Sequence, residues 1–193
     1  MRKIIKSANG AVTYGGKVLC KMDDTLPSGY TSIQAVSLNS LFDTGVKTKD
    51  TSVIEARVNV GSTTATYLWR SDSNTSGRTN TTAYSSSGGN WRFGNQTFTI
   101  SNSTFARAFH DFKLDRGGVW RDGTKVNSYG TVSAFTSSAT LQFGSSTASV
   151  SNAFSYFKHT IDGVVVSWYI ACRRDSDNAE GFYDIVNDIF IEI

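Results

Sequence analysis

Alternation of apolar and polar residues is clearest in residues 106–129. Phe112 and Leu114 alternate there with charged neighbours, as expected for a strand with one buried face. Asp115–Gly118 supplies a turn in which glycine can take positive φ, and Asp122–Gly123 supplies a tight two-residue hairpin turn of the primed type. This stretch therefore predicts a meander of three antiparallel strands.

Short strands separated by Gly, Ser and Asn turns are predicted along most of the chain. In the strand near residues 52–60, Ile54, Ala56, Val58 and Val60 share one face and are expected to face the core. No stretch shows a helical period of useful length, so the pattern predicts an all-β protein, a two-sheet antiparallel jelly-roll sandwich. The other strands are expected near residues 32–38, 41–46, 64–70, 81–85, 90–94, 97–101, 139–144, 153–162, 164–171, 181–184 and 188–193.

The first residues of the chain form a distinct segment. Ala11–Tyr14 and Lys17–Met22, joined by Gly15–Gly16, predict a small hairpin, and Asp23–Gly29 predicts a linker. An isolated hairpin is marginal in water, so this arm must dock on its own domain or on another chain. We therefore predict a docking arm at residues 1–29 and one jelly-roll domain at residues 30–193. The residues expected to make the arm's contacts are Val12, Tyr14, Val18 and Leu19.

Composition narrows the functional classes. The 193 residues are 39% hydrophobic with a net charge of +3, and the Lys and Arg residues are scattered, so no nucleic-acid partner is expected. No apolar stretch is long enough to span a membrane, and the basic start Met1–Lys6 is not followed by the apolar run of a signal peptide. The sequence thus predicts synthesis in a cytoplasm without a standard export signal. Cys20 and Cys172 are interpreted as free thiols, and a disulfide between them stays open.

Four segments of the chain share motifs with one known family. They read IQAVSLNSLFDTGV at Ile33–Val46, FHDFKL at Phe109–Leu114, VWRDGTKV at Val119–Val126, and IACRR followed by GFYD between Ile170 and Asp184. In this order they resemble the laminin-G-like domains of the concanavalin A-like lectin/glucanase superfamily found in bacteriophage structural proteins and gut bacteria. Phe109 stands in place of that family's tryptophan, and Ala171 in place of its proline. The resemblance implies a jelly roll of two curved sheets, a fold that hosts lectins, glycosidases and structural modules.

Catalytic chemistry finds little support. Glycoside hydrolysis needs two carboxylates roughly 5–10 Å apart, yet Glu55 has no carboxylate two or four residues away. His110 and His159 share parity with apolar neighbours and have no nucleophile at a suggestive spacing, so they are expected to be half-buried structural residues. We predict no catalytic residues and no cofactor.

Calcium is the metal to consider, because the resemblance implies domains that bind it at the rim of the sandwich. Asp72 and Asp115 are the candidates, but no clustered D-x-D-x-D pattern accompanies them. We therefore predict no metal site.

Saccharide binding is the best-supported site chemistry. Residues 71–90 are almost wholly small and polar and are expected to form surface loops and edge strands. Tryptophan faces stack on sugar rings while Arg and Asn hydrogen-bond hydroxyls. The candidate glycan-binding residues that flank this stretch are Trp69, Arg70, Asn90, Trp91 and Arg92. The alternative is that Trp69, Trp91, Trp120 and Trp168 are core or half-buried strand residues.

Together these observations favour a bacteriophage virion protein. It would decorate the capsid or belong to a head or tail fibre, be joined to other virion proteins and to its own copies through the arm, and adhere to glycans of the host or of mucus. The alternative is a free lectin-like carbohydrate-binding module. A glycosidase is disfavoured.

Overall fold

The computed structural model describes residues 5–6, 11–14, 17–21, 26–60, 67–71, 78–85, 88–100, 108–146 and 151–193, with side chains from Leu26 onward except those of residues 78–85, 88, 98 and 100. The protein is all-β, and its described residues contain no helix. The strands pair antiparallel throughout, as expected from the short alternating segments. No described helix is therefore available to cross a membrane.

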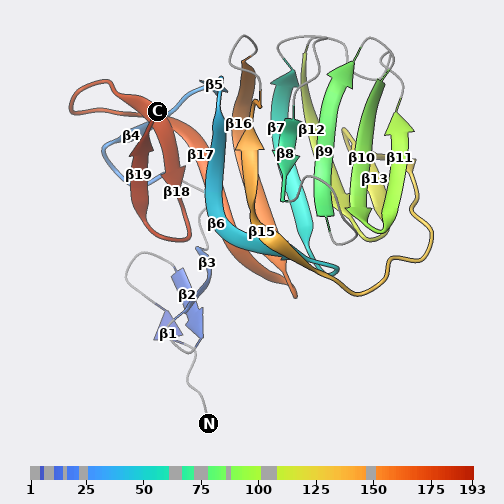
Figure 1. The fold of residues 1–193 in the computed structure, drawn as a ribbon. Coiled ribbons are helices and arrows are strands. Elements are labelled where there is room, and N and C mark those ends of the chain that lie inside the picture. The colour runs from blue at the N-terminus through green and yellow to red at the C-terminus, as the bar shows by residue number, and fades with distance from the viewer. Residues whose placement is uncertain are drawn as a thin grey trace.

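The strands form three sheets (Figure 1). The smallest contains β1 (Ile5–Lys6), β2 (Ala11–Tyr14) and β3 (Lys17–Lys21). The six-stranded sheet has the order β11 (Gln96–Ile100), β10 (Gly88–Gly94), β9 (Arg78–Ser85), β8 (Tyr67–Arg70), β15 (Thr136–Gly144) and β6 (Leu41–Lys49).

The ten-stranded sheet carries most of the remaining chain. Its main path is β14 (Thr124–Asn127), β13 (Gly118–Arg121), β12 (Phe109–Asp115), β7 (Val53–Val60), β16 (Asn152–Ile161), β17 (Val164–Arg174), β18 (Glu180–Asp184) and β19 (Ile189–Glu192). Two short strands complete it, because β4 (Tyr30–Ser32) pairs with β17 and β5 (Val36–Leu38) pairs with β16.

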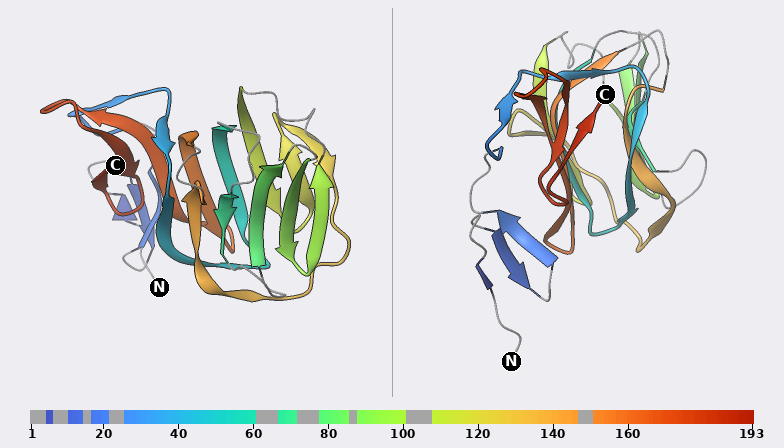
Figure 2. Two further views of the ribbon diagram at one scale, coloured as in Figure 1. Left: turned by 45° about the horizontal axis from the view of Figure 1, so that its top comes forward. Right: turned by 90° about the vertical axis from the view of Figure 1, so that its left-hand side faces the viewer.

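The two large sheets pack face to face as two layers (Figure 2). Aromatic rings from both layers fill the space between them. Phe143 of β15 stacks on Phe157 of β16 with ring centroids 4.2 Å apart, and Trp91 of β10 lies 5.2 Å from Phe112 of β12. We call the opposite side of each sheet its outer face.

The predicted meander is confirmed as β12, β13 and β14. Asp122 and Gly123 both have positive φ, at 48° and 76°, as the primed hairpin turn requires. The predicted inward face of β7 is also confirmed, since Ile54, Ala56 and Val58 are fully buried.

Three local expectations change. The strand expected at residues 32–38 is split into β4 and β5 around Ile33–Ala35. The polar stretch 71–90 was expected to give loops and edge strands, but β9 lies inside the six-stranded sheet and pairs with both β8 and β10. Backbone pairing on both sides needs no apolar side chain, and threonine suits a strand. The predicted arm hairpin is present as β2 and β3, with β1 added to it.

A second apolar cluster lies on the outer face at one end of the ten-stranded sheet. Cys172, Tyr183 and Ile185 are buried there, with Leu26 and Tyr30 packed against them. Part of the predicted linker is therefore fixed to this sheet. Burial raises the pKa of the Cys172 thiol to about 11, so this cysteine is an unreactive core residue.

Candidate functional site

The candidate glycan-binding residues lie on two opposite faces of the six-stranded sheet. Trp69 and Trp91 are 0% exposed, and their rings lie 5.5 Å apart in the core. Arg70, Asn90 and Arg92 are partly exposed on the outer face. Neither indole is available to stack on a sugar, because both rings are buried in the core between the two sheets.

The other two tryptophans occupy the outer face of the ten-stranded sheet. Trp120 of β13 and Trp168 of β17 are partly buried. The alternative interpretation of the tryptophans as core or half-buried strand residues is therefore confirmed for all four. Trp120 and Trp168 are the two whose rings reach the surface of the molecule.

A single row of side chains joins these two tryptophans across the sheet. Each residue is directly opposite the next in strand register, and all lie on the outer face. The row, which we call the tryptophan row, consists of Lys125, Trp120, Lys113, Glu55, Lys158 and Trp168. With neighbouring strands about 4.8 Å apart, its two tryptophans are separated by about 19 Å.

Cationic side chains lie against both rings of the row. The Nζ atoms of Lys113 and Lys125 are 4.5 and 5.1 Å from the centroid of Trp120. The Nζ atom of Lys158 is 4.8 Å from the centroid of Trp168 and 3.7 Å from Glu55 Oε2. The row thus alternates aromatic surface, ammonium donors and a carboxylate acceptor.

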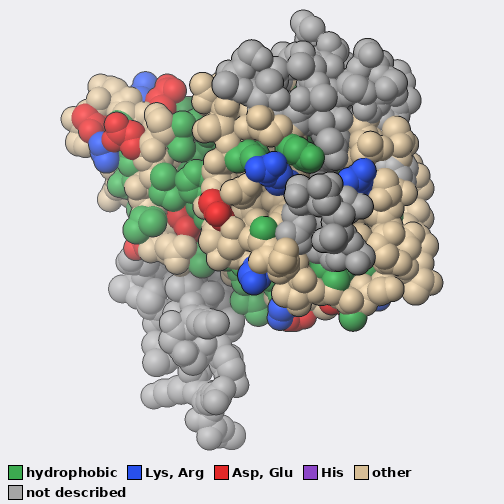
Figure 3. All heavy atoms as spheres, viewed as in Figure 1, with side chains coloured by type: hydrophobic (Ala, Val, Ile, Leu, Met, Phe, Trp, Pro, Cys, Tyr) green, Lys and Arg blue, Asp and Glu red, His purple; other side chains and the backbone are tan. Residues whose placement is uncertain are grey.

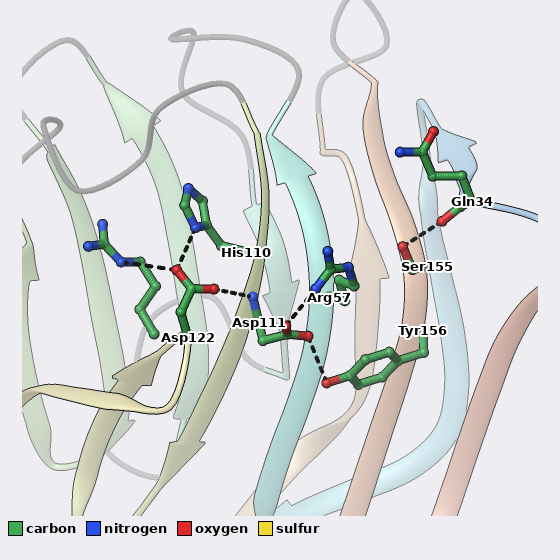
Figure 4. Close-up of polar contacts among 8 residues, drawn as sticks. Gln34, Arg57, His110, Asp111, Asp122, Ser155 and Tyr156 are labelled. Carbon is green, nitrogen blue, oxygen red and sulfur yellow. Dashed lines mark hydrogen bonds and ion pairs between the residues drawn. The ribbon is translucent and has the colours of Figure 1, made fainter.

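A second row of polar residues runs beside the first. Asp111 and Tyr156 are both opposite Arg57 on β7. The Asp111 carboxylate accepts hydrogen bonds from Arg57 Nη1 at 2.6 Å and from the Tyr156 hydroxyl at 3.2 Å (Figure 4). Burial, together with the Asp111 charge, raises the pKa of Tyr156 above its usual range, so its hydroxyl stays protonated and donates.

The β13–β14 turn is fastened to the same network. Asp122 accepts a hydrogen bond from the Asp111 amide at 3.0 Å, and its other oxygen lies 2.7 Å from His110 Nδ1 (Figure 4). Burial opposes ionisation of Asp122, but these hydrogen bonds and the His110 charge hold its pKa below the usual range. His110 is thus the half-buried structural residue that its strand parity predicts, with a side chain 18% exposed.

Two adjoining cavities open between these rows. One, of about 320 Å³, is lined by Ile33, Lys158, Trp168 and Ile170 among others. The other, of about 330 Å³, is lined by Asp111, Lys113, Trp120 and Gly123 among others. Both cavities are also lined by Glu55 and Tyr156, so they lie side by side on the outer face between Trp168 and Trp120, and we call the two together the groove.

The groove begins where the sheet divides. The pairing of β16 with β7 shifts register between Phe154 and Tyr156. Before this shift β16 pairs with β5 along its other edge, and after it β16 pairs with β17. The segment after β4 enters this gap, where Ile33 donates its amide to the Ala171 carbonyl and Gln34 accepts from the Ser155 hydroxyl. Ile33 of this segment lines one side of the cavity at Trp168.

The structure also brings close together two carboxylates that are distant in the sequence. Glu55 and Asp111 are diagonal neighbours on β7 and β12, a relation that places Cα atoms roughly 7–8 Å apart. Both are ion-paired, with Lys158 and Arg57 respectively. A general acid must hold a proton, so this arrangement suits hydrogen-bond acceptance better than proton donation.

Other candidate centres do not assemble. Ser52 Oγ lies 2.9 Å from His159 Nε2, but both side chains are buried and out of reach of a substrate. Asp115 accepts a hydrogen bond from the Gly117 amide and pairs with Lys113, which are structural contacts of a turn. The described residues hold no group of His, Cys, Asp and Glu suited to a metal ion. Asp72 lies outside the described residues, as do the side chains of Val12, Tyr14, Val18 and Leu19.

Comparison with known proteins gives the chain no family. No protein-family model matches its sequence, and no curated protein is significantly similar to it. The groove and the ten-stranded sheet that carries it are therefore the basis for a functional assignment.

Proposed function

We propose that the protein is a saccharide-binding display module, which takes an extended, uncharged glycan into the groove between Trp120 and Trp168. The single observation that carries this proposal is the tryptophan row. It offers aromatic surface at both ends and a carboxylate and ammonium groups between them, the combination with which proteins bind sugars. The fold that we propose for the two packed sheets is the concanavalin A-like, laminin-G-like jelly roll that the sequence motifs resemble.

The charges of the groove favour an uncharged ligand. Glu55 is neutralised by Lys158, and Asp111 by Arg57, with N···O distances of 3.7 and 2.6 Å. Sugar hydroxyls both donate to carboxylates and accept from ammonium groups. A sugar ring that stacks on either tryptophan displaces a lysine, and the flexible lysine stem can then turn its donor to the bound hydroxyls. We propose binding rather than hydrolysis, because neither carboxylate is placed as a proton donor.

Removing either groove tryptophan should abolish most of the binding. We expect Trp120→Ala and Trp168→Ala each to weaken the affinity for an oligosaccharide identified on a glycan array by about tenfold or more, as for a central aromatic contact. Calorimetric titration of the purified variants measures this effect.

The control is Phe109→Ala, which removes a ring from the same outer face outside the groove. Phe109 is partly buried and lies under Arg57, with the guanidinium 5.9 Å from its ring. The Phe109→Ala variant should bind the oligosaccharide with unchanged affinity. A folded protein that binds nothing on the array, or one whose binding survives in both tryptophan variants, would contradict the proposal.

We further propose that this module is displayed on a bacteriophage particle, as a capsid decoration or as part of a head or tail fibre. Support comes from the motif resemblance and from the N-terminal sheet, whose strands β1, β2 and β3 share no ladder with either large sheet. A separate sheet of this size gains little stability alone, so contact with other virion proteins or with further copies of the chain would stabilise it.

Deletion of residues 1–25 should separate assembly from folding. Leu26 and Tyr30, which pack on the second apolar cluster, are retained in this variant. We expect the full chain to be oligomeric in light scattering, and the deletion variant to be monomeric with an unchanged melting temperature and no incorporation into particles. Normal incorporation of the deletion variant would rule out an assembly role for the arm.

A further inference from the structure

The outer face of the six-stranded sheet, opposite to the groove, carries a second row of polar residues. They are in direct register across the sheet, and we call them the arginine row. Its members are Thr97, Arg92, Arg70, Gln142 and Asp43, and the backbone of β9 at Asn80 pairs between Arg92 and Arg70. Arg70 and Arg92 flank β9 on this row, with Cα atoms about 10 Å apart, the width of two strand spacings.

The two guanidinium groups lack anionic partners among the described residues. Arg70 donates from Nε to Gln142 Oε1 at 3.2 Å and lies over Tyr67 at 5.3 Å from the ring centroid. Arg92 Nε is buried and has no hydrogen-bond partner in the described part of the protein. Both arginine side chains are partly exposed, so their guanidinium groups keep their charge and remain open to an anionic ligand.

The acidic residue of this row does not neutralise the arginines. The Asp43 carboxylate accepts hydrogen bonds from the Gly45 amide and from the Thr140 hydroxyl, both at 2.8 Å. Figure 3 views the molecule from the side of this sheet and shows Lys and Arg side chains as separate patches among backbone, hydrophobic side chains and other uncharged side chains. The face therefore carries a local positive charge beside amides and hydroxyls.

We propose that Arg70 and Arg92 form a second binding site, for an acidic polysaccharide that bears sulfate or carboxylate groups. Guanidinium groups bind such oxyanions in bidentate fashion, and a polymer with repeated anionic groups engages both arginines at once. Asn90 and Gln142 stand beside them as donors and acceptors for sugar hydroxyls. Nucleic acid is the less suitable polyanion, because its closely spaced phosphates call for a longer basic stripe.

This site is independent of the groove, and its test uses the full chain with dextran sulfate as the probe. Binding is measured by biolayer interferometry at low and at physiological ionic strength, with unsulfated dextran in parallel. We expect Arg70→Gln and Arg92→Gln each to weaken binding to dextran sulfate by about tenfold, as for a lost charge-assisted hydrogen bond. Arg116→Gln is the matched control, since Arg116 is 58% exposed in the β12–β13 turn and its removal changes the net charge equally.

Retention of affinity in Arg116→Gln, and in the groove variant Trp120→Ala, would support a distinct site. Equal losses in all three arginine variants would show that net charge alone drives binding and would overturn the proposal. Binding of a single-stranded oligonucleotide with the same strength and the same dependence on Arg70 and Arg92 would overturn the assignment to a saccharide. Melting temperatures verify that each variant is folded.

Discussion

Replacing Phe143 by alanine is expected to lower the free energy of unfolding by about 3–5 kcal/mol. Phe143 is fully buried at the centre of the core, where its ring stacks on Phe157 at 4.2 Å and lies 5.2 Å from both Phe42 and Phe154. Its truncation removes contacts with both sheets and leaves a cavity that rigid β-strands cannot close. Because whole domains are stable by only about 5–15 kcal/mol, this loss is a large share of the total.

Urea unfolding followed by tryptophan fluorescence measures the change. Phe143→Leu is the graded comparison and should retain more than half of the lost stability, since most of the volume is preserved. Ile193→Ala is the surface control, because Ile193 is 54% exposed, and it should change stability by less than about 0.5 kcal/mol. A cost below about 1 kcal/mol for Phe143→Ala would mean that the two sheets are not held together by this aromatic core.

Local patterns predicted the parts of the fold that depend on neighbouring residues. The meander follows from alternation in β12 and from the Asp122–Gly123 turn, whose positive φ values are confirmed. The same alternation also indicates the orientation of Trp91. It stands between polar Asn90 and Arg92 and shares parity with Phe93, and both aromatic rings are fully buried. A consistent use of parity would therefore have assigned this ring to the core.

The groove could not be predicted in this way, because it depends on strand order. Lys113, Glu55 and Lys158 are distant in the sequence and meet only because β7 lies between β12 and β16. Trp168 gives no parity signal either, since both faces of its strand are apolar near Tyr169 and Ile170. Spacing along one strand likewise misses the proximity of Glu55 to Asp111, which is a cross-strand relation.

The buried side chain of His159 gives the second large prediction, a loss of stability in acid. His159 is fully buried, and its Nε2 atom lies 2.9 Å from Ser52 Oγ, while Nδ1 has no partner in the described part of the protein. Burial lowers the pKa of His159 to about 4, from an ordinary value near 6.5. No carboxylate of the described residues is hydrogen-bonded to the ring to favour its protonated form.

The direction of the effect follows from the two pKa values. The unfolded chain binds a proton at His159 as the pH falls below about 6.5, whereas the folded protein does so only near pH 4. The contribution of neutral His159 is therefore fully present above pH 6.5 and is lost between pH 6.5 and 4. A difference of this size corresponds to about 3 kcal/mol in total, or about 1.4 kcal/mol for each pH unit within that window.

Urea unfolding at a series of pH values from 7 to 4.5 tests this prediction. In the variant His159→Gln the decline with falling pH should be shallower by about that slope, because the titrating group is gone while an amide can still hydrogen-bond Ser52. In His110→Gln, which removes the other histidine at the surface network of Asp122, the wild-type decline should persist. An NMR titration of the folded protein gives a measurement that does not depend on the stability of either variant. A His159 imidazole that titrates near pH 6.5 in the folded state would contradict the prediction. The core would then accept the protonated ring that its burial should exclude.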